Sequence, residues 1–173
     1  MAEVYSIGHS NLSLERFVHA LEMFGVTSVV DVRSAPFSRW SPQFNRERLA
    51  ADLPAAGISY RYAGEALGGR PKDLAMYRHG FIPDDRLEFL EHVDYQRVAE
   101  QPWFQLGIQR LLDLAASETV AMMCTEEDPS SCHRQHLIEM AIGDRAVVRH
   151  IRTNGGRTRL ESKAAMVEQT RLF

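Results

Sequence analysis

The sequence lacks the features that mark several large classes of protein. None of its apolar runs approaches the roughly 18 residues that a membrane-spanning helix needs. Its 173 residues include only two cysteines, which do not form the disulfide framework of a secreted domain, and the chain does not start with a basic and apolar leader. These absences predict a cytoplasmic protein without a membrane span.

Neither sign of charge dominates, because 20 basic residues stand against 23 acidic ones. A polycationic face that binds nucleic acid non-specifically is therefore not expected overall, although local basic clusters remain open. Nucleotide-binding glycine motifs are also missing. Residues 8–11 join a predicted strand to a helix, but they have neither the dinucleotide glycine pattern nor a Walker lysine. We predict no bound cofactor.

The apolar pattern that is present predicts alternating strands and helices. Strands are expected over residues 4–7, 26–32, 58–62, 120–123 and 146–151. Helices are expected from an N-cap at Ser13 to a stop at Gly25, from Asn45 to about residue 56 with a stop at Gly57, and from about residues 84 and 102. The pattern predicts a single α/β domain over residues 1–173, with a mostly parallel sheet flanked by helices in Rossmann-like layers.

Two segments do not fit this alternation. Residues 64–83 show no clear period, and a connection of that length is usually a functional loop or a disordered one. Residues 152–173 form a C-terminal extension, in which Asn154 and Gly155 indicate a turn. A hairpin, a helix or a frayed end is compatible with this extension.

Residues 120–134 are the most informative stretch of the chain. An apolar strand runs through an acidic turn, and a helix is expected to follow and to continue to about residue 142. Cys124 closes the strand and Cys132 opens the helix. A thiol in the first turn of a helix has a lowered pKa, because the positive end of the helix dipole stabilises the thiolate.

Polar residues follow four of the predicted strands. Because ligands bind at the carboxyl ends of parallel strands, we expect these side chains to converge on one edge of the sheet. They are His9 and Ser10, Asp31 and Arg33, Arg61 and Glu65, and Cys124 and Glu126.

Several short motifs occur in a fixed order: Ser-Ile-Gly-His-Ser (6–10), Val-Asp-Val-Arg (30–33) with Pro36 and Ser38, Phe44-Asn45, Leu-Gly-Gly (67–69), Cys-Thr-Glu-Glu-Asp-Pro (124–129) and Cys-His-Arg (132–134). In this order the sequence resembles domain of unknown function family 488 over residues 4–151. Thr125 and Glu127 depart from the pattern, where a small residue and Lys are more usual. The resemblance implies a shared site but no reaction.

The leading hypothesis is an enzyme that binds a phosphate-bearing substrate, a nucleotide or nucleic acid, at the carboxyl edge of the sheet. Helix-terminal amides and a fixed guanidinium suit such an anion. The expected catalytic residues are Cys132, His9, Cys124 and Glu126. The expected anion-binding residues are Arg33, Arg134, Ser10, His133, Gly68 and Gly69.

Other hypotheses stay open at this point. Cys124, Cys132, His133 and His9 could ligate a metal ion, although their spacing matches no zinc motif, and Cys124 and Cys132 could form a reversible disulfide. The basic and aromatic residues between 33 and 46 could bind nucleic acid without catalysis. The structural alternatives are packed cysteines, Arg134 paired with an acidic residue of the turn, a hydrogen-bonded His9, and a buried Asp31–Arg33 pair.

Overall fold

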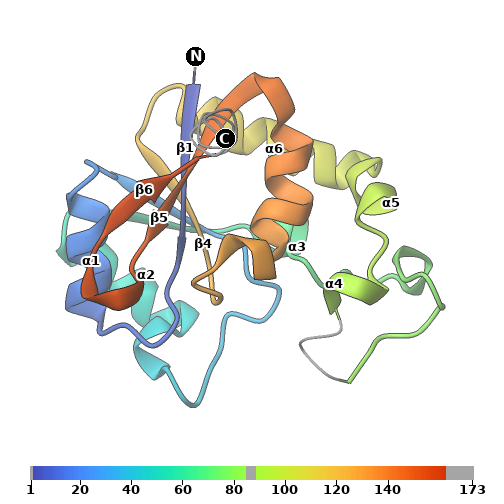
Figure 1. Cartoon of the computed structure of the whole chain (residues 1–173), viewed down its shortest axis with the longest axis horizontal. Helices are drawn as coiled ribbons and strands as arrows, with labels where there is room; N and C mark the ends of the chain where they lie inside the picture. Colours follow the sequence, from blue (N-terminus) through green and yellow to red (C-terminus); the bar gives the residue numbers. More distant parts are fainter. Residues whose placement is uncertain (1, 85–88, 163–173) are drawn as a thin grey trace, which may run out of the picture.

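A six-stranded sheet forms the middle layer of the protein (Figure 1). The computed structural model describes residues 2–84 and 89–162. The strand order is β3-β2-β4-β1-β5-β6, with all neighbouring strands parallel except the antiparallel pair β5 and β6. This confirms the predicted α/β fold with a mostly parallel sheet. The strands are β1 (Ala2–Gly8), β2 (Ser28–Asp31), β3 (Ser59–Tyr62), β4 (Val120–Cys124), β5 (Ala146–Arg152) and β6 (Arg159–Glu161).

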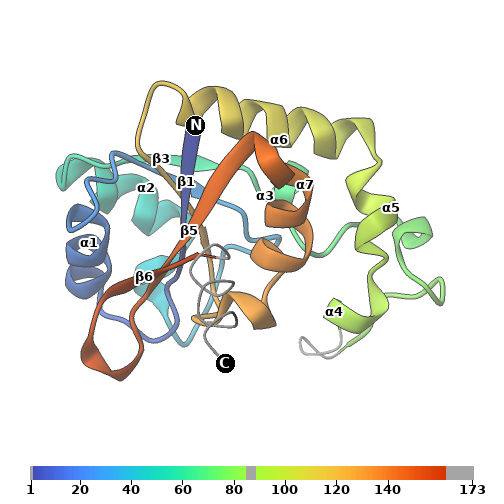
Figure 2. The ribbon, with the colours of Figure 1, turned by 45° about the horizontal axis from the view of Figure 1, so that its top comes forward.

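Helices cover both faces of the sheet (Figure 2). Helices α1 (Leu14–Glu22) and α2 (Arg46–Ala55) pack on one face, where they bury residues such as Phe17 and Leu53. The other face is covered by α3 (Gly64–Leu67), α5 (Tyr95–Ala99), α6 (Pro102–Ala115) and α7 (Met140–Ile142), with α4 (Phe89–His92) at the edge of that layer. None of the described helices is long and apolar enough to cross a membrane.

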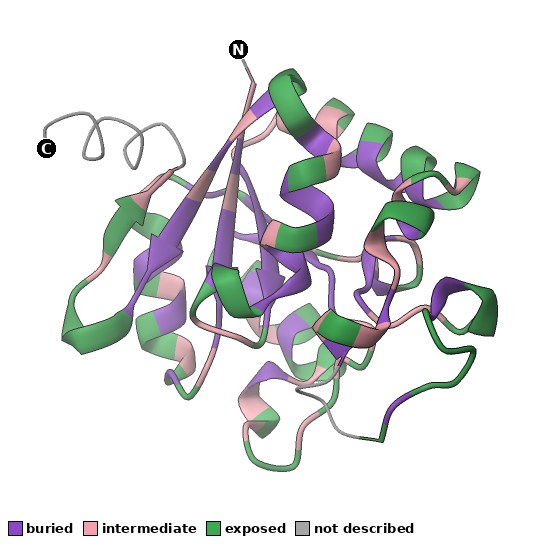
Figure 3. Ribbon diagram, turned by 45° about the vertical axis from the view of Figure 1, so that its right-hand side comes forward, coloured by how far each residue is buried: buried purple, intermediate pink, exposed green. Residues whose placement is uncertain are grey.

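The burial pattern follows these layers. The strands are mostly buried, and the covering helices alternate between buried and exposed residues along their length (Figure 3). All five residues of β4 and all four of β2 are buried, as expected for near-continuous apolar strands inside a parallel sheet. The strands that carry the candidate site are therefore its most rigid support.

Local signals account for most helix boundaries. The Ser13 side chain caps α1 by accepting a hydrogen bond from the Arg16 amide at 3.3 Å, as predicted. Gly25 and Gly57 have φ angles of +64° and +76°, which residues other than glycine rarely adopt. Asn45 stands at the N-cap position of α2, but its side chain accepts from the Ser38 amide at 2.7 Å instead of capping the helix.

Residues 64–100 differ most from the prediction. The loop expected over residues 64–83 contains α3 and a 3-10 turn at Leu74–Met76, which are too short to give a visible period. A helix was expected from about residue 84; residues 85–88 lie outside the described residues, and Phe89–His92 form α4. Helix α5 was not predicted. It begins after Asp94, whose side chain accepts from the Arg97 amide at 3.1 Å.

The C-terminal extension folds back as a hairpin, one of the alternatives that the turn signal left open. Strand β6 pairs with the end of β5, and the loop that joins the two strands contains Gly155 and Gly156, both with positive φ. The Glu127 carboxylate ties this loop to the acidic turn after β4, because it accepts from the amides of Thr153 and Asn154 at 2.9 and 3.2 Å. Residues 163–173 of the extension lie outside the described residues.

Candidate functional site

The loops after β1 and β4 lie directly against each other at the carboxyl edge of the sheet. The amides of His9 and Ser10 donate to the carbonyls of Cys124 and Thr125 at 2.9 and 2.8 Å. A side chain at Gly8 would overlap the backbone of Glu126, so only glycine allows this approach. The Gly-His-Ser motif therefore fixes the position of the loop that carries Cys124.

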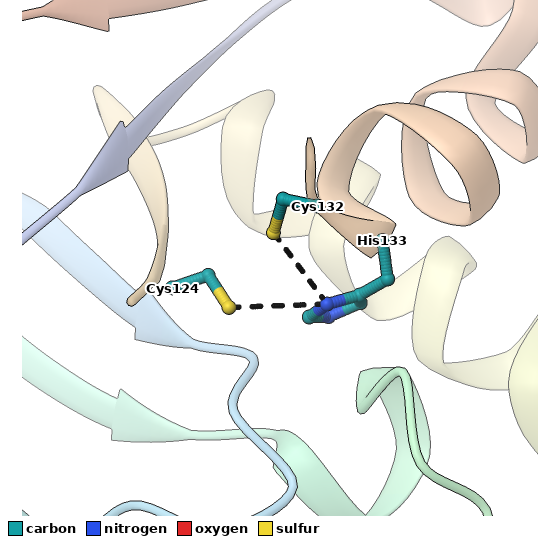
Figure 4. A group of neighbouring side chains, drawn as sticks. All are labelled: Cys124, Cys132 and His133. Atoms are coloured by element: carbon teal, nitrogen blue, oxygen red, sulfur yellow. Dashed lines mark hydrogen bonds between the residues drawn. The ribbon is translucent and has the colours of Figure 1, made fainter. Parts of the chain in front are cut away.

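Two thiols and an imidazole meet at this edge. Cys124 ends β4, whereas Cys132 and His133 immediately precede a π-helical segment, Arg134–Glu139, that continues into α7. The prediction that Cys132 lies in the first turn of this helix was wrong, because its backbone is extended and the helical segment begins at Arg134. Both sulfurs point toward the same nitrogen of His133, with Sγ to Nδ1 distances of 3.8 Å for Cys124 and 3.7 Å for Cys132 (Figure 4). The three side chains are buried and their ligating atoms lie within 4.8 Å of one another. We call them the thiol–imidazole cluster.

The hydrogen bonds of His133 determine its tautomer. Its Nε2 lies 3.1 Å from the carbonyl oxygen of Val32, which can only accept, so Nε2 carries the hydrogen. The lone pair of Nδ1 then faces the two sulfurs. Gly69 packs against the ring, and a Cβ at that position would lie 2.5 Å from Cγ of His133. The imidazole is therefore held from both sides with its free nitrogen toward the thiols.

The two cysteines differ in their protonation. The Cys124 thiol donates to Oε2 of Glu126 at 3.2 Å, and Cys132 accepts from Nε of Arg134 at 3.3 Å. The pKa of Cys124 is raised, first by its interaction with the neighbouring Cys132 sulfur and then by burial. Burial also acts to raise the pKa of Cys132, but the interaction with Cys124, the charge of Arg134 and the contact with His133 outweigh it and lower that pKa well below its usual value. Of the two thiols, Cys132 is therefore the one that loses its proton more readily.

Arg134 is a buried cation, with 1% of its surface exposed. Its Nη1 donates to Ser6 Oγ at 3.0 Å and its Nη2 to the backbone carbonyl of Glu126. Within residues 2–84 and 89–162 no carboxylate forms an ion pair with it, and the acidic residues Glu127 and Asp128 pair with Arg152 instead. A buried charge requires a counter-charge. Cys132, whose Sγ accepts from Nε of Arg134, is the neighbouring group that can supply it on losing its proton.

Asp31 and Arg33 form a second buried group beside the cluster. The Arg33 guanidinium donates to both carboxylate oxygens of Asp31, at 2.9 Å from Nε and 2.6 Å from Nη2, and also to the Phe44 carbonyl at 2.7 Å. The period of two along a strand predicted that these two side chains share a face. Most of the donors of Arg33 are thus used inside the protein.

His9 lies in this second group and not in the thiol–imidazole cluster. Its Nδ1 donates to the carbonyl of Ser10 at 2.9 Å, its Nε2 accepts from Nη1 of Arg33 at 3.3 Å, and its ring stacks on Phe44 with centroids 4.3 Å apart. Burial, followed by the charge of Arg33, lowers the pKa of His9 to about 4. His9 is therefore neutral near pH 7 and both of its nitrogens are occupied.

A small cavity of about 70 Å³ opens onto the cluster. Of the residues predicted for the site, Cys124, Cys132, His133, Glu126, Arg33 and Gly69 line it, whereas His9, Ser10, Gly68 and Arg134 do not. Ser34, Arg70, Phe89 and Tyr95 also line the cavity, and none of them was among the residues predicted for the site. Arg70 follows the Leu-Gly-Gly motif directly, and that position was the available signal. The Tyr95 hydroxyl donates to the Gly69 carbonyl at 3.1 Å and so closes the wall.

A larger hollow of about 370 Å³ adjoins this cavity, and Ser34 and Arg70 line both. Trp103 and Lys72 contribute an exposed aromatic ring and a second cation to the larger hollow, while Glu65 and Asp73 contribute carboxylates. The guanidinium of Arg70 stacks 4.4 Å above the ring of Phe89. Arg70 is therefore a cation that belongs to the linings of both spaces.

The chain was also compared with known proteins and protein families. Searches of curated proteins and of solved structures found no match to the chain. The family model described as domain of unknown function DUF488 matches residues 13–141, which contain both cysteines, His133, Gly69 and Arg70. The Ser-Ile-Gly-His-Ser motif and β5 lie outside the matched residues. Because the match covers most of the sequence, the chain belongs to the family described as domain of unknown function DUF488.

Proposed function

We propose that the protein is an enzyme of the reducing cytoplasm, that the thiol–imidazole cluster is its reactive centre, and that its substrate carries a phosphate group. One observation carries this proposal: the only two cysteines of the chain and His133 line a cavity that shares Ser34 and Arg70 with a larger hollow. Buried thiols that only pack do not need a cavity beside them. Converging polar groups in a cleft at the carboxyl edge of a parallel sheet are typical of a reactive site.

The volumes of the two spaces suit two different parts of a substrate. The inner cavity, at about 70 Å³, is less than half of the roughly 150 Å³ that an engineered cavity needs to hold benzene. It admits a small reacting group. The outer hollow, at about 370 Å³, falls within the range of roughly 300–1,000 Å³ for small-molecule sites and takes the body of the substrate.

Arg70 is the cation that we assign to the phosphate group. Arg33 and Arg134 are buried. Arg33 donates mainly to Asp31, and Arg134 donates to Cys132 of the cluster and to its loop, so the donors of both are used within the protein. Arg70 is half-buried and reaches both spaces. Its planar guanidinium can bind two phosphate oxygens at once.

Binding of inorganic phosphate to the full chain, measured by calorimetry, tests this assignment. We expect Arg70→Gln to weaken binding about 10-fold or more, because a charge-assisted hydrogen bond contributes roughly 1.5 kcal/mol. Arg48→Gln is the matched control, since Arg48 is 67% exposed and, among the described residues, forms its ion pair with Asp52 on α2. Equal binding by the Arg70 variant and the wild type would contradict the phosphate assignment.

The catalytic part is tested with p-nitrophenyl phosphate as a generic phosphate ester. We expect turnover by the wild type and its loss in Cys132→Ala, with phosphate binding retained because Arg70 is untouched. Residual activity equal to the wild type would show that the cluster is not the reactive centre.

A second candidate function rests on the segment of residues 33–46. Trp40 is 82% exposed and Phe37 is 66% exposed, and the Arg39 guanidinium lies 5.0 Å from the Trp40 ring. Exposed aromatic rings beside cations stack on the bases of single-stranded nucleic acid. This candidate predicts that a labelled oligonucleotide binds with affinity that falls steeply with salt and that Trp40→Ala weakens it, whereas Cys132→Ala does not.

A further inference from the structure

The thiol–imidazole cluster has the composition of a metal centre. Cys124 and Cys132 offer two sulfurs and His133 offers one nitrogen, and all three atoms lie within 4.8 Å of one another (Figure 4). Thiolate sulfur together with imidazole nitrogen is the donor set that Zn²⁺ prefers in proteins. The chain has no other cysteine, so both of its thiols are placed at this one point.

The distances fit a tetrahedral ion without a change in the backbone. With zinc bonds of about 2.3 Å to sulfur and about 2.05 Å to nitrogen, tetrahedral geometry separates a sulfur from a nitrogen ligand by about 3.6 Å and two sulfurs by about 3.8 Å. The observed Sγ to Nδ1 distances are 3.8 Å and 3.7 Å. The two sulfurs, which lie within 4.8 Å, need to approach by at most about 1 Å, which a side-chain rotation supplies.

The surroundings of the cluster already meet the requirements of a ligated metal. The Nε2–H of His133 is bound by the Val32 carbonyl at 3.1 Å, and this contact is the usual partner of a metal-bound histidine because it fixes the ring and leaves Nδ1 as the ligand atom. Arg134 donates to the sulfur of Cys132 at 3.3 Å, which offsets the negative charge of two thiolates. A packing role for the cysteines accounts for neither contact.

We propose that Cys124, Cys132 and His133 bind one Zn²⁺ ion and that its fourth position opens into the small cavity. Three protein ligands with an open position are typical of catalytic zinc sites, whereas structural sites are closed by four protein ligands. The cavity is lined by all three ligands and by Glu126, whose carboxylate is placed to accept a proton from a group that enters. This inference rests on the proposed function in taking the cluster as the reactive centre, and it names the metal that the centre uses.

Metal content and cobalt spectroscopy of the full chain test the proposal without any assay of turnover. The wild type, expressed with zinc and purified without chelator, is expected to hold close to one Zn²⁺ per chain. Replacement by Co²⁺ is expected to give the thiolate-to-cobalt charge-transfer band and the strong visible bands of a tetrahedral site. Because the chain has only two cysteines, a charge-transfer band must arise from Cys124, Cys132 or both.

Variants locate the site. His133→Ala is expected to weaken metal binding about 100-fold or more, since loss of even a residue that supports a ligand weakens binding roughly 10–100-fold. His136→Ala is the matched control, because His136 is exposed on the same π-helical segment, its Nε2 contacts the Ser130 carbonyl, and it is not one of the three residues of the cluster. Cys124→Ser and Cys132→Ser are each expected to reduce the charge-transfer band, and circular dichroism of every variant verifies that it is folded.

Two results would overturn the inference. One is a wild-type chain that holds no stoichiometric zinc and gives no charge-transfer band with Co²⁺. The other is equal metal binding by the His133 and His136 variants. The proposed function can fail separately. A chain that binds zinc but neither phosphate nor p-nitrophenyl phosphate supports the zinc site and refutes the proposed function. Turnover that depends on Cys132 without any metal supports the proposed function and refutes the zinc site.

Discussion

His9 allows a quantitative test of whether the Gly-His-Ser motif supplies an acid–base group or a structural one. The folded protein holds the pKa of His9 at about 4, below the ordinary value of 6.5, because the ring is buried and lies against Arg33. The unfolded chain therefore takes up the proton first as the pH falls. The titration of His9 should therefore lower the free energy of unfolding progressively from about pH 6.5 down to about pH 4, and it should lower it no further below that pH.

The size of this effect follows from the shift of 2.5 units between 6.5 and about 4. At about 1.36 kcal/mol per unit it amounts to roughly 3 kcal/mol at its limit, and to about 2.5 kcal/mol at pH 4.5. His9→Gln keeps an acceptor for Arg33 but does not titrate. The difference in unfolding free energy between wild type and variant should therefore shift by about 2.5 kcal/mol, in favour of the variant, between pH 7.5 and pH 4.5.

Urea unfolding of both proteins at the two pH values measures this difference directly. Other titrating groups cancel, since the two proteins share them. A difference that is the same at both pH values would refute the reasoning. It would mean that His9 titrates near its ordinary pKa in the folded protein and remains available as an acid or base at neutral pH.

Three further predictions concern the support of the site. Gly69→Ala should displace the His133 ring, because the new Cβ would lie 2.5 Å from its Cγ. Metal affinity, measured by competition with a chelator, should therefore fall at least about 10-fold. Unchanged affinity would show that the ring can adapt. Glu127→Gln should lower the unfolding free energy by about 1–2 kcal/mol at neutral pH through its weakened contacts to Arg152 and to the hairpin amides. Those contacts lower the pKa of Glu127 from 4.5, and only its partial burial opposes them. The stability that wild type gains over Glu127→Gln should therefore persist above pH 4.5 and be lost as the carboxylate protonates below it. Urea unfolding at several pH values measures this loss. Arg33→Met should cost about 3–5 kcal/mol in the same measurement, because it leaves the buried carboxylate of Asp31 without its cation; a cost below about 1 kcal/mol would contradict the pairing.

The sequence by itself determined the layers of the protein and the edge at which its polar residues meet. Short apolar runs, the Ser13 cap and the stops at Gly25 and Gly57 are local signals, and each acts within a few residues of the chain. Parallel strands place all their carboxyl ends on one edge, so strand order was not needed to expect Cys124 and Arg33 near each other. Where local signals were weak, as in α5 and in the turns of residues 64–83, the prediction failed.

Only the tertiary structure decided what these residues do to one another. His133 takes its tautomer from the carbonyl of Val32, 101 positions away, and Arg134 is positioned by Ser6, 128 positions away. The same folding carries His9 to Arg33, and not to the thiols. Protonation, charge balance and ligand geometry depend on distances of 3 to 4 Å between elements remote in sequence, and periodicity along one element does not fix such distances.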